Sequence, residues 1–297
     1  DNLNFNKISP ELFFEFKKKH KRSPVRQTVR IKQTNIILET AANISDSRPP
    51  VYKYDTNFIA INDFTYNLTN SRIINPYNIC LNVQHGEGFV KSSVTINHKI
   101  TFKGKRKSLD IRLFAGKFFK HPNNFDGKYF FKTSGARGVD DYMYDYIYPA
   151  RAEIYPYTSY TSSENTPVEQ LFSHQFAETD GSMKIYCPIG NSNSVMTALN
   201  LKCSLPGKIP FRLFVDVVVF PDKTVLGQNI LSDAGIYFSF RDVINIYIPF
   251  VWSEDIDKMI KLRMHNKKGF SKFADNIRFT FNIHTLNPFE IIRNFSL

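Results

Sequence analysis

The sequence contains little cysteine, and none of it in a spacing typical of a metal site or a redox pair. Cys80, Cys187 and Cys203 lie far apart among 297 residues and form no C-x-x-C pair. They are too few for a disulfide framework, and their spacing matches no zinc motif. We therefore expect three reduced cysteines inside the fold and no structural metal.

Long hydrophobic runs are also missing. No apolar stretch approaches the roughly 18 or more residues of a membrane-spanning helix, and the N-terminal residues lack the apolar region of a secretory signal. The sequence therefore predicts a soluble chain with no membrane span. It begins at Asp1, which we interpret as truncation or as proteolytic release from a longer precursor.

The motifs of the common enzyme classes are absent as well. The sequence has no nucleophile elbow, phosphate-binding P-loop, H-E-x-x-H zinc motif or dinucleotide-binding glycine motif. His85-Gly86-Glu87-Gly88 fits a turn between strands, and His98 falls on the apolar side of a strand, where a histidine is more often a core residue than a base. We predict no catalytic residue, no metal ligand and no cofactor, so the chain is not expected to be an enzyme.

Acidic residues are missing between Phe16 and Glu39, where eight lysines and arginines follow one another. Subtracting these eight reduces the net charge from +12 to +4. Such a cluster binds phosphates by releasing condensed counterions, and we predict a nucleic-acid site formed by Lys17, Lys18, Lys19, Lys21, Arg22 and Arg26. The alternative is a solvated helix face with no partner.

Aromatic residues are abundant, with 28 Phe and 15 Tyr, and they favour strands. Apolar and polar residues alternate most regularly over 94–102, and again over 109–115 and 211–220, so each segment has one apolar and one polar face. We read 94–102 and 109–115 as neighbouring antiparallel strands. In total we expect about nine or ten strands in an all-β, antiparallel fold.

Two or three short helices are expected in addition to the strands. Ser9, Pro10 and Glu11 have the cap, first-turn proline and acid that begin a helix, with Leu12, Phe13 and Phe16 as its apolar face. Thr166 to Glu169 forms a capping box for a helix to about Phe172. Ser253 begins the third helix, which has acids in its first turn.

The segment from Gly116 to about Glu164 loses all periodicity, and such long irregular segments usually form contacts. Its tyrosines alternate with carboxylates, which favours a protein interface over a metal site or a catalytic pair. We predict subunit contacts by Asp140, Asp141, Tyr142, Tyr144 and Tyr146, and by Trp252 at a strand end, where the alternative is an anchor in the core.

Two segments, 183–189 and 243–252, each form a strand that ends in proline and an apolar or aromatic residue. This pattern resembles the capsid proteins of picorna-like RNA viruses of the dicistrovirus, iflavirus and marnavirus type. Segments 94–102 and 109–116 are similar to the adjacent C and D strands of those proteins. Asp140-Asp141-Tyr142 differs from the Asp-Asp-Phe cleavage motif of some members, so we do not transfer that role.

The resemblance implies a jelly-roll β-sandwich with a few short helices in connecting loops. It divides the chain into an N-terminal arm with a short helix and the basic cluster (1–24), a capsid domain (25–285) and a C-terminal tail (286–297). It also implies cleavage from a polyprotein, assembly with identical and different subunits into an icosahedral shell, and RNA bound by the arm. The expected location is the virion, and the host cytoplasm during assembly.

Two alternatives stay open. One is a jelly-roll vertex (penton) protein of a DNA virus or virophage, since the abundance of Asn, Ile, Lys, Phe and Tyr fits either source. The other is a carbohydrate-binding β-sandwich in which tyrosines between Tyr142 and Tyr160 stack on sugars; it predicts sugar affinity for a monomer.

Overall fold

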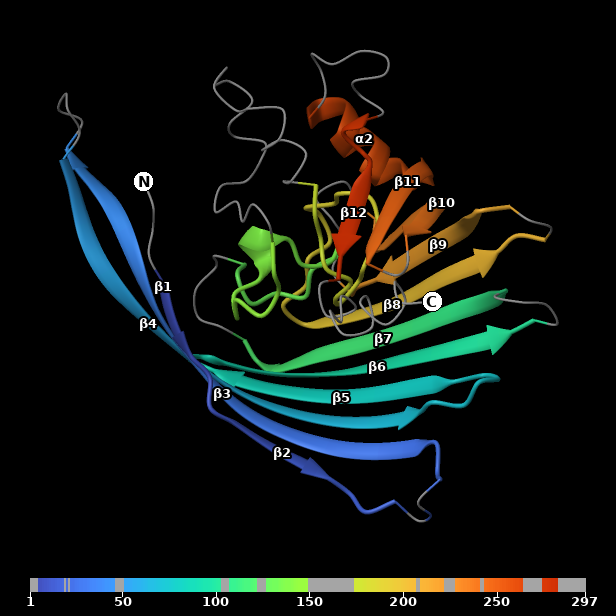
Figure 1. Ribbon diagram of the computed structural model, residues 1–297. Helices are drawn as coiled ribbons and strands as arrows, with labels where there is room; N and C mark the ends of the chain where they lie inside the picture. Colours follow the sequence, from blue (N-terminus) through green and yellow to red (C-terminus); the bar gives the residue numbers. More distant parts are fainter. Residues whose placement is uncertain are drawn as a thin grey trace, which may run out of the picture.

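A single antiparallel sheet makes up nearly all of the regular structure in the described part of the chain (Figure 1). In this computed structural model the described residues are 5–18, 20, 22–45, 51–102, 107–121, 127–148, 174–206, 209–221, 228–240, 243–263 and 274–282.

Twelve strands and two short helical segments follow one another along these residues. They are β1 (Phe5–Ile8), β2 (Glu11–Glu15), β3 (Val25–Ser45), β4 (Val51–Asn70), β5 (Tyr77–Gly86), β6 (Phe89–Thr101), β7 (Ser108–Lys120), the 3-10 helix η1 (Gly138–Asp140), β8 (Val195–Ser204), β9 (Phe211–Val219), β10 (Ile230–Phe240), β11 (Ile244–Trp252), α2 (Glu254–Arg263) and β12 (Arg278–Phe281).

The strands form a meander. From β3 to β12 each strand pairs with the strand that follows it in the chain, and both β1 and β2 pair with β3. Figure 1 shows that the sheet curves strongly, and that the described residues between β7 and β8 (127–148 and 174–194) lie within its concave side. The predicted all-β, antiparallel class is confirmed. The jelly-roll topology is not confirmed, because a jelly roll needs strands that cross between two sheets.

The predicted N-terminal helix is wrong. Residues 11–15 form β2, which pairs with β3 from Glu11 opposite Lys32 to Glu15 opposite Thr28. The helix-start signal at Ser9 and Pro10 is local and weak, and pairing with a long strand overrides it. Residues 5–15 therefore belong to the sheet and not to a separate arm.

Other local predictions are confirmed. The segments at 94–102 and 109–115 lie side by side as β6 and β7, with Ile96 opposite Leu113. Helix α2 follows Ser253 and carries Glu254, Asp255 and Asp257 in its first turn. The helix predicted at 166–172 and the tail at 286–297 lie outside the described residues.

The hydrophobic core lies on the concave side of the sheet. There Phe131, from the segment between β7 and β8, packs edge-on against Phe114 and Phe118 of β7. Gly116 permits this approach, because a Cβ there would lie 2.5 Å from the Phe131 ring. The same cluster includes Phe89, Met183, Ile185, Cys187, Met196, Ala198, Val218, Phe220, Leu231, Ile256 and Ile260.

Candidate functional site

The sheet presents polar side chains on its concave face at positions that face each other from strand to strand. The strand register aligns one such row across seven strands, from β4 to β10. Its members are Thr69, Asn78, Asn97, Arg112, Asn200, Asp216 and Asp233. Every member of this row is polar, so the interior behind the sheet is polar at this level.

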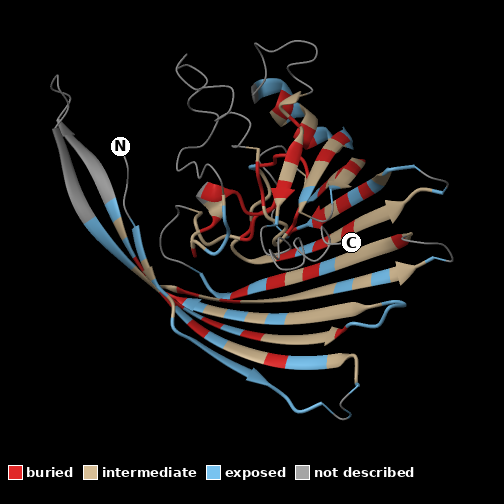
Figure 2. Ribbon diagram, in the orientation of Figure 1, coloured by how far each residue is buried: buried red, intermediate tan, exposed pale blue. Residues whose placement is uncertain are grey.

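The neighbouring row, one residue along each strand, points to the other face because side chains alternate. It consists of Leu68, Ile79, Ile96, Leu113, Leu199 and Val217. Leu113 is 45% exposed, and Phe119 near the end of the same strand is 66% exposed. Figure 2 shows buried positions alternating with exposed ones along the strands. The apolar face of the sheet is therefore the outer one.

Charge is nearly absent from this outer face. Along β6 to β9 the outward positions include no acidic residue and no arginine. The lysines among them, Lys117 and Lys120, lie at one end of β7. Exposed apolar areas this broad mark contact with a membrane or another protein.

Residues 127–148 and 174–194, between β7 and β8, form what we call the inner segment. Polar contacts from the sheet bind it to the concave face. Lys91 Nζ donates to the Tyr129 carbonyl at 2.9 Å. Arg112 Nη1 donates at 2.7 Å to the Asp180 carbonyl and, at the same distance, to Asn200 Oδ1. Asn200 Nδ2 donates to the Gly181 carbonyl at 3.0 Å. These contacts identify the concave face as the inner one.

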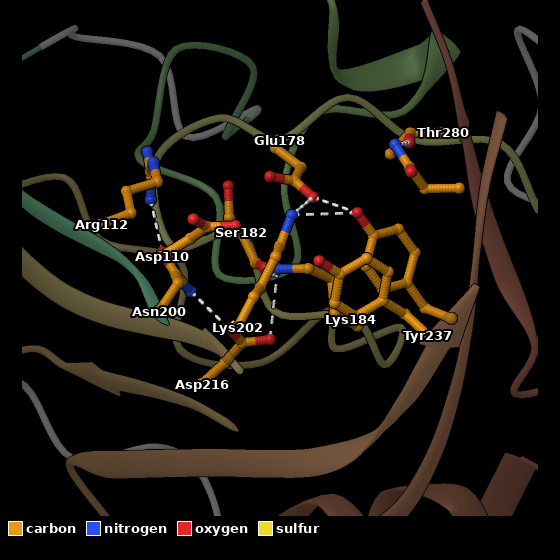
Figure 3. A network of polar contacts seen from close by, with 12 residues as sticks. Asp110, Arg112, Glu178, Ser182, Lys184, Asn200, Lys202, Asp216, Tyr237 and Thr280 are labelled. Atoms are coloured by element: carbon orange, nitrogen blue, oxygen red, sulfur yellow. Dashed lines mark hydrogen bonds and ion pairs between the residues drawn. The ribbon is translucent and has the colours of Figure 1, made fainter. Parts of the chain in front are cut away.

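A buried ion pair lies at the centre of this interior (Figure 3). Lys184 Nζ is 3.3 Å from Asp216 Oδ2, and both side chains are 0% exposed. Asp216 also accepts a hydrogen bond from Asn200 at 2.8 Å. Asp233 accepts the backbone N–H groups of Lys184 and Ile185 at 3.0 and 2.8 Å. One cation thus lies close to two buried carboxylates and joins the inner segment to β9 and β10.

A second polar cluster lies beside the first. The Glu178 carboxylate accepts hydrogen bonds from Lys202 Nζ and from the Tyr247 hydroxyl. Burial alone would raise the pKa of Glu178, but the nearby ammonium groups of Lys202 and Lys184 and both hydrogen bonds lower it well below its usual range. Glu178 is therefore ionised and paired at neutral pH.

A third polar cluster joins the N-terminal strands to the inner segment. Asp145 Oδ1 lies 2.6 Å from Lys7 Nζ of β1 and 2.5 Å from Lys32 Nζ of β3. Beside it the Phe5 ring lies 4.2 Å from that of Tyr144. Burial works to raise the pKa of Asp145, yet the hydrogen bonds from the two lysines outweigh it and lower the pKa. Lys32 belongs to the basic stretch of the sequence and points inward.

Most of the residues predicted to form subunit contacts point into the molecule. Asp140 lies 3.3 Å from Arg137 Nε, and buried Asp141 accepts the N–H groups of Asp145 and Tyr146. The Tyr142 hydroxyl donates to Gln84 at 2.5 Å, and burial raises the pKa of this tyrosine well above its usual value. We attribute the Tyr-Asp alternation to the lining of a polar interior.

Trp252 and Tyr146 differ from the other predicted contact residues. Trp252 packs against the hydrophobic core, and its indole N–H donates to Asp257 of α2 at 3.3 Å. This agrees with the alternative of a core anchor at a strand end. Tyr146 is 44% exposed.

The predicted nucleic-acid site lies in the connection between β2 and β3. Lys17, Lys18 and Arg22 are exposed there. Arg26 forms an ion pair with Glu15 at 2.8 Å. Lys19 and Lys21 lie outside the described residues. Binding of RNA by this cluster stays a prediction.

The sequence reasoning missed the buried charges. The alternation over 211–220 places Asp216 on the polar face of its strand, whereas Asp216 is fully buried. The register that aligns Asp216 with Asn200 and Asp233 was the missing information.

Within the described ranges no group of three or more His, Cys, Asp or Glu side chains could hold a metal ion.

Comparison with known proteins leaves the family open. No model of a known protein family matches the chain, and no curated protein matches it significantly. Among the residues that the structure covers, none of the helices has the length and apolar character to cross a membrane.

Proposed function

We propose that this protein is embedded in a membrane through its sheet, with the outer face in contact with lipid acyl chains and the inner face enclosing a polar interior. The observation that carries the proposal is an apolar outer face that lies next to a row of polar residues on the inner face. The row from Thr69 to Asp233 faces inward, while the adjacent row from Leu68 to Val217 faces outward. In water, an exposed apolar row next to a buried polar row has an unfavourable free energy.

The strand lengths support the same proposal. Strands β5 to β11 contain 9 to 13 residues. At about 3.3 Å per residue they are about 30 to 43 Å long. A tilt of roughly 45° gives about 21 to 30 Å across the membrane, which matches a hydrocarbon layer or apolar band of about 25 to 30 Å.

The near absence of charge favours lipid over a protein partner. Protein interfaces contain about one hydrogen bond per 100–200 Å² and have a polar rim. The outward positions of β6 to β9 provide few groups for such bonds. Hydrocarbon also offers no hydrogen bonds to a free strand edge. The proposal therefore requires that the edges formed by β1 and β2 and by β12 pair with each other or with further strands.

Shell assembly around RNA remains the second proposal. It needs an apolar surface between subunits, which the outer face would supply, but the jelly roll that the resemblance implies is not confirmed. The exposed cations Lys17, Lys18 and Arg22 fit either partner, because lipid headgroups and RNA both present phosphates.

Thiol accessibility tests the proposal directly. Cys80 lies on the inner face of β5 among polar residues, and Leu113 lies on the outer face of β7. With Cys187 and Cys203 replaced by alanine, we compare Cys80 with a Leu113→Cys variant that also carries Cys80→Ala. After incorporation into phospholipid vesicles, a small charged thiol reagent should modify Cys80 and leave residue 113 unmodified until the protein is unfolded.

The other outcomes are distinct. Fast modification at residue 113 in vesicles would overturn the proposal. Protection of residue 113 in lipid-free particles of many subunits would favour the shell instead.

A further inference from the structure

Two cavities lie on the concave face of the sheet, between the strands and the inner segment. The first has a volume of about 430 Å³ and is lined by Asp63, Gln84 and Lys91, among others. The second has a volume of about 490 Å³ and is lined by Thr69, Asn78 and Lys99, among others. Both belong to the polar interior described above.

The cavities follow one another along the strands. On β4 the first cavity touches Asp63 and Thr65, and the second begins four residues further on, at Thr69. The strand β6 shows the same order, with Ser93 in the first cavity and Lys99 in the second. Since the strands would cross the membrane, the two cavities succeed one another from one side of the membrane to the other.

Three residues line both cavities: Asn97, Arg112 and Glu178. Arg112 is fixed by its hydrogen bonds to Asn200 and to the Asp180 carbonyl. Glu178 is fixed by its contacts with Lys202 and Tyr247. Asn97 lies opposite Arg112 in the β6–β7 pair. These three side chains therefore form the boundary between the cavities.

The walls suit small hydrophilic solutes. Amide and hydroxyl groups of Asn82, Ser93 and Thr95 line the first cavity. Its charged groups are of both signs and partly paired, as for Asp63, which accepts hydrogen bonds from Asn82 and Gln84 at 2.7 and 3.0 Å. Pore selectivity depends on diameter, on lining donors and acceptors and on electrostatic barriers. Walls that carry both carboxylates and cations can contact ions of either sign.

We propose that the two cavities are parts of one polar passage through the interior, with its narrowest point at Asn97, Arg112 and Glu178, and that it conducts small ions and small neutral sugars. This inference rests on the proposed membrane function.

Conductance of the full chain in planar phospholipid bilayers in potassium chloride tests the passage. Asn97→Trp places a large ring at the narrowest point and should remove most of the conductance. Ile96→Trp is the matched control, because it adds the same ring to the outer face of the same strand and should leave the conductance unchanged. Equal conductance in the two variants would overturn the proposal.

A second variant guards against misfolding of Asn97→Trp. In a chain whose native cysteines are replaced by alanine, Asn97→Cys should conduct until a bulky thiol reagent is added after reconstitution, and a reductant should restore the current. A current that the reagent leaves unchanged would contradict the passage.

The passage and the membrane proposal fail in different ways. Protein that inserts, protects residue 113 from the charged reagent and carries no current would refute the passage alone. Protein that does not insert would refute both.

Discussion

The free-energy cost of burying a charged residue in the interior depends on its partners. Lys184 and Asp216 are fully buried, and each ion has lost its hydration. A buried pair contributes little net stability, whereas removal of one partner leaves an uncompensated charge. The packing of the inner segment against the sheet therefore depends on both Lys184 and Asp216.

We expect Lys184→Met to destabilise the protein by about 3–5 kcal/mol, because Asp216 and Asp233 would remain buried without their cation. Lys117→Met, on the outer face near one end of β7, is the control and should change the free energy of unfolding little. Urea unfolding in phospholipid vesicles, followed by Trp252 fluorescence, measures both. Equal stability of the two variants would show that the ion pair is not buried in the native protein.

Asp145 makes a pH-dependent contact. Its pKa in the folded protein is lowered by Lys32 and Lys7, in spite of burial. The contact therefore stabilises fully above the unfolded value of about 3.9 and is lost as the pH falls through the lower, folded pKa. We predict that the hydrogen-exchange protection factors of residues 141–146 fall only below about pH 4.

Asp145→Asn is the matched variant for this pH dependence. It should show fast exchange of residues 141–146 already at neutral pH, with little further change in acid. An acid response of the same size in the variant and the parent protein would assign the effect to other carboxylates.

At the scale of elements, the sequence allowed a good part of the sheet to be predicted. The alternation over 94–102 and 109–115 located β6 and β7 and divided their residues into two faces. The same alternation contains no information on which face is enclosed, because a strand with an apolar side has the same pattern against a protein core and against lipid. Alternating strands also contain no long apolar run, so a search for such runs does not detect them.

The sequence predicted where the inner segment lies along the chain, but not how it packs against the sheet. Loss of periodicity after Gly116 predicts an irregular segment with contacts to other subunits, whereas the contacts that the structure describes there lie within the chain. Its packing against the concave face depends on long-range contacts, such as Phe131 with Phe114 and Asp180 with Arg112. The candidate site follows from this packing and from the strand register, and neither can be read from local spacing.

Packing of the inner segment predicts opposite effects of substitution at two adjacent residues of β7. Gly116→Leu should destabilise the protein by about 1–3 kcal/mol, because a Cβ at this position would lie 2.5 Å from the Phe131 ring. Ala115→Leu, on the outer face, should be tolerated. Thermal unfolding of the two variants in vesicles makes the comparison, and a larger loss for Ala115→Leu would reverse the assignment of the faces.

At the scale of the whole molecule, depth in the membrane should govern the cost of a charge on the outer face. Leu113 lies in the middle of β7 and Leu109 near its end. We expect Leu113→Arg to cost about 2–4 kcal/mol and Leu109→Arg about 0–1 kcal/mol, because arginine is most costly at the membrane midplane. Unfolding from vesicles measures both. Equal costs at the two positions would contradict a membrane around the sheet.

The most direct measurement is a nitroxide scan along β6, from residue 91 to residue 101, in phospholipid vesicles. Odd-numbered positions belong to the inner face and even-numbered positions to the outer face. We predict that even positions are relaxed by oxygen, which concentrates in lipid, and odd positions by a water-soluble nickel complex, with a period of two. Even positions accessible to the nickel complex, or closed to both reagents, would contradict a lipid-facing sheet.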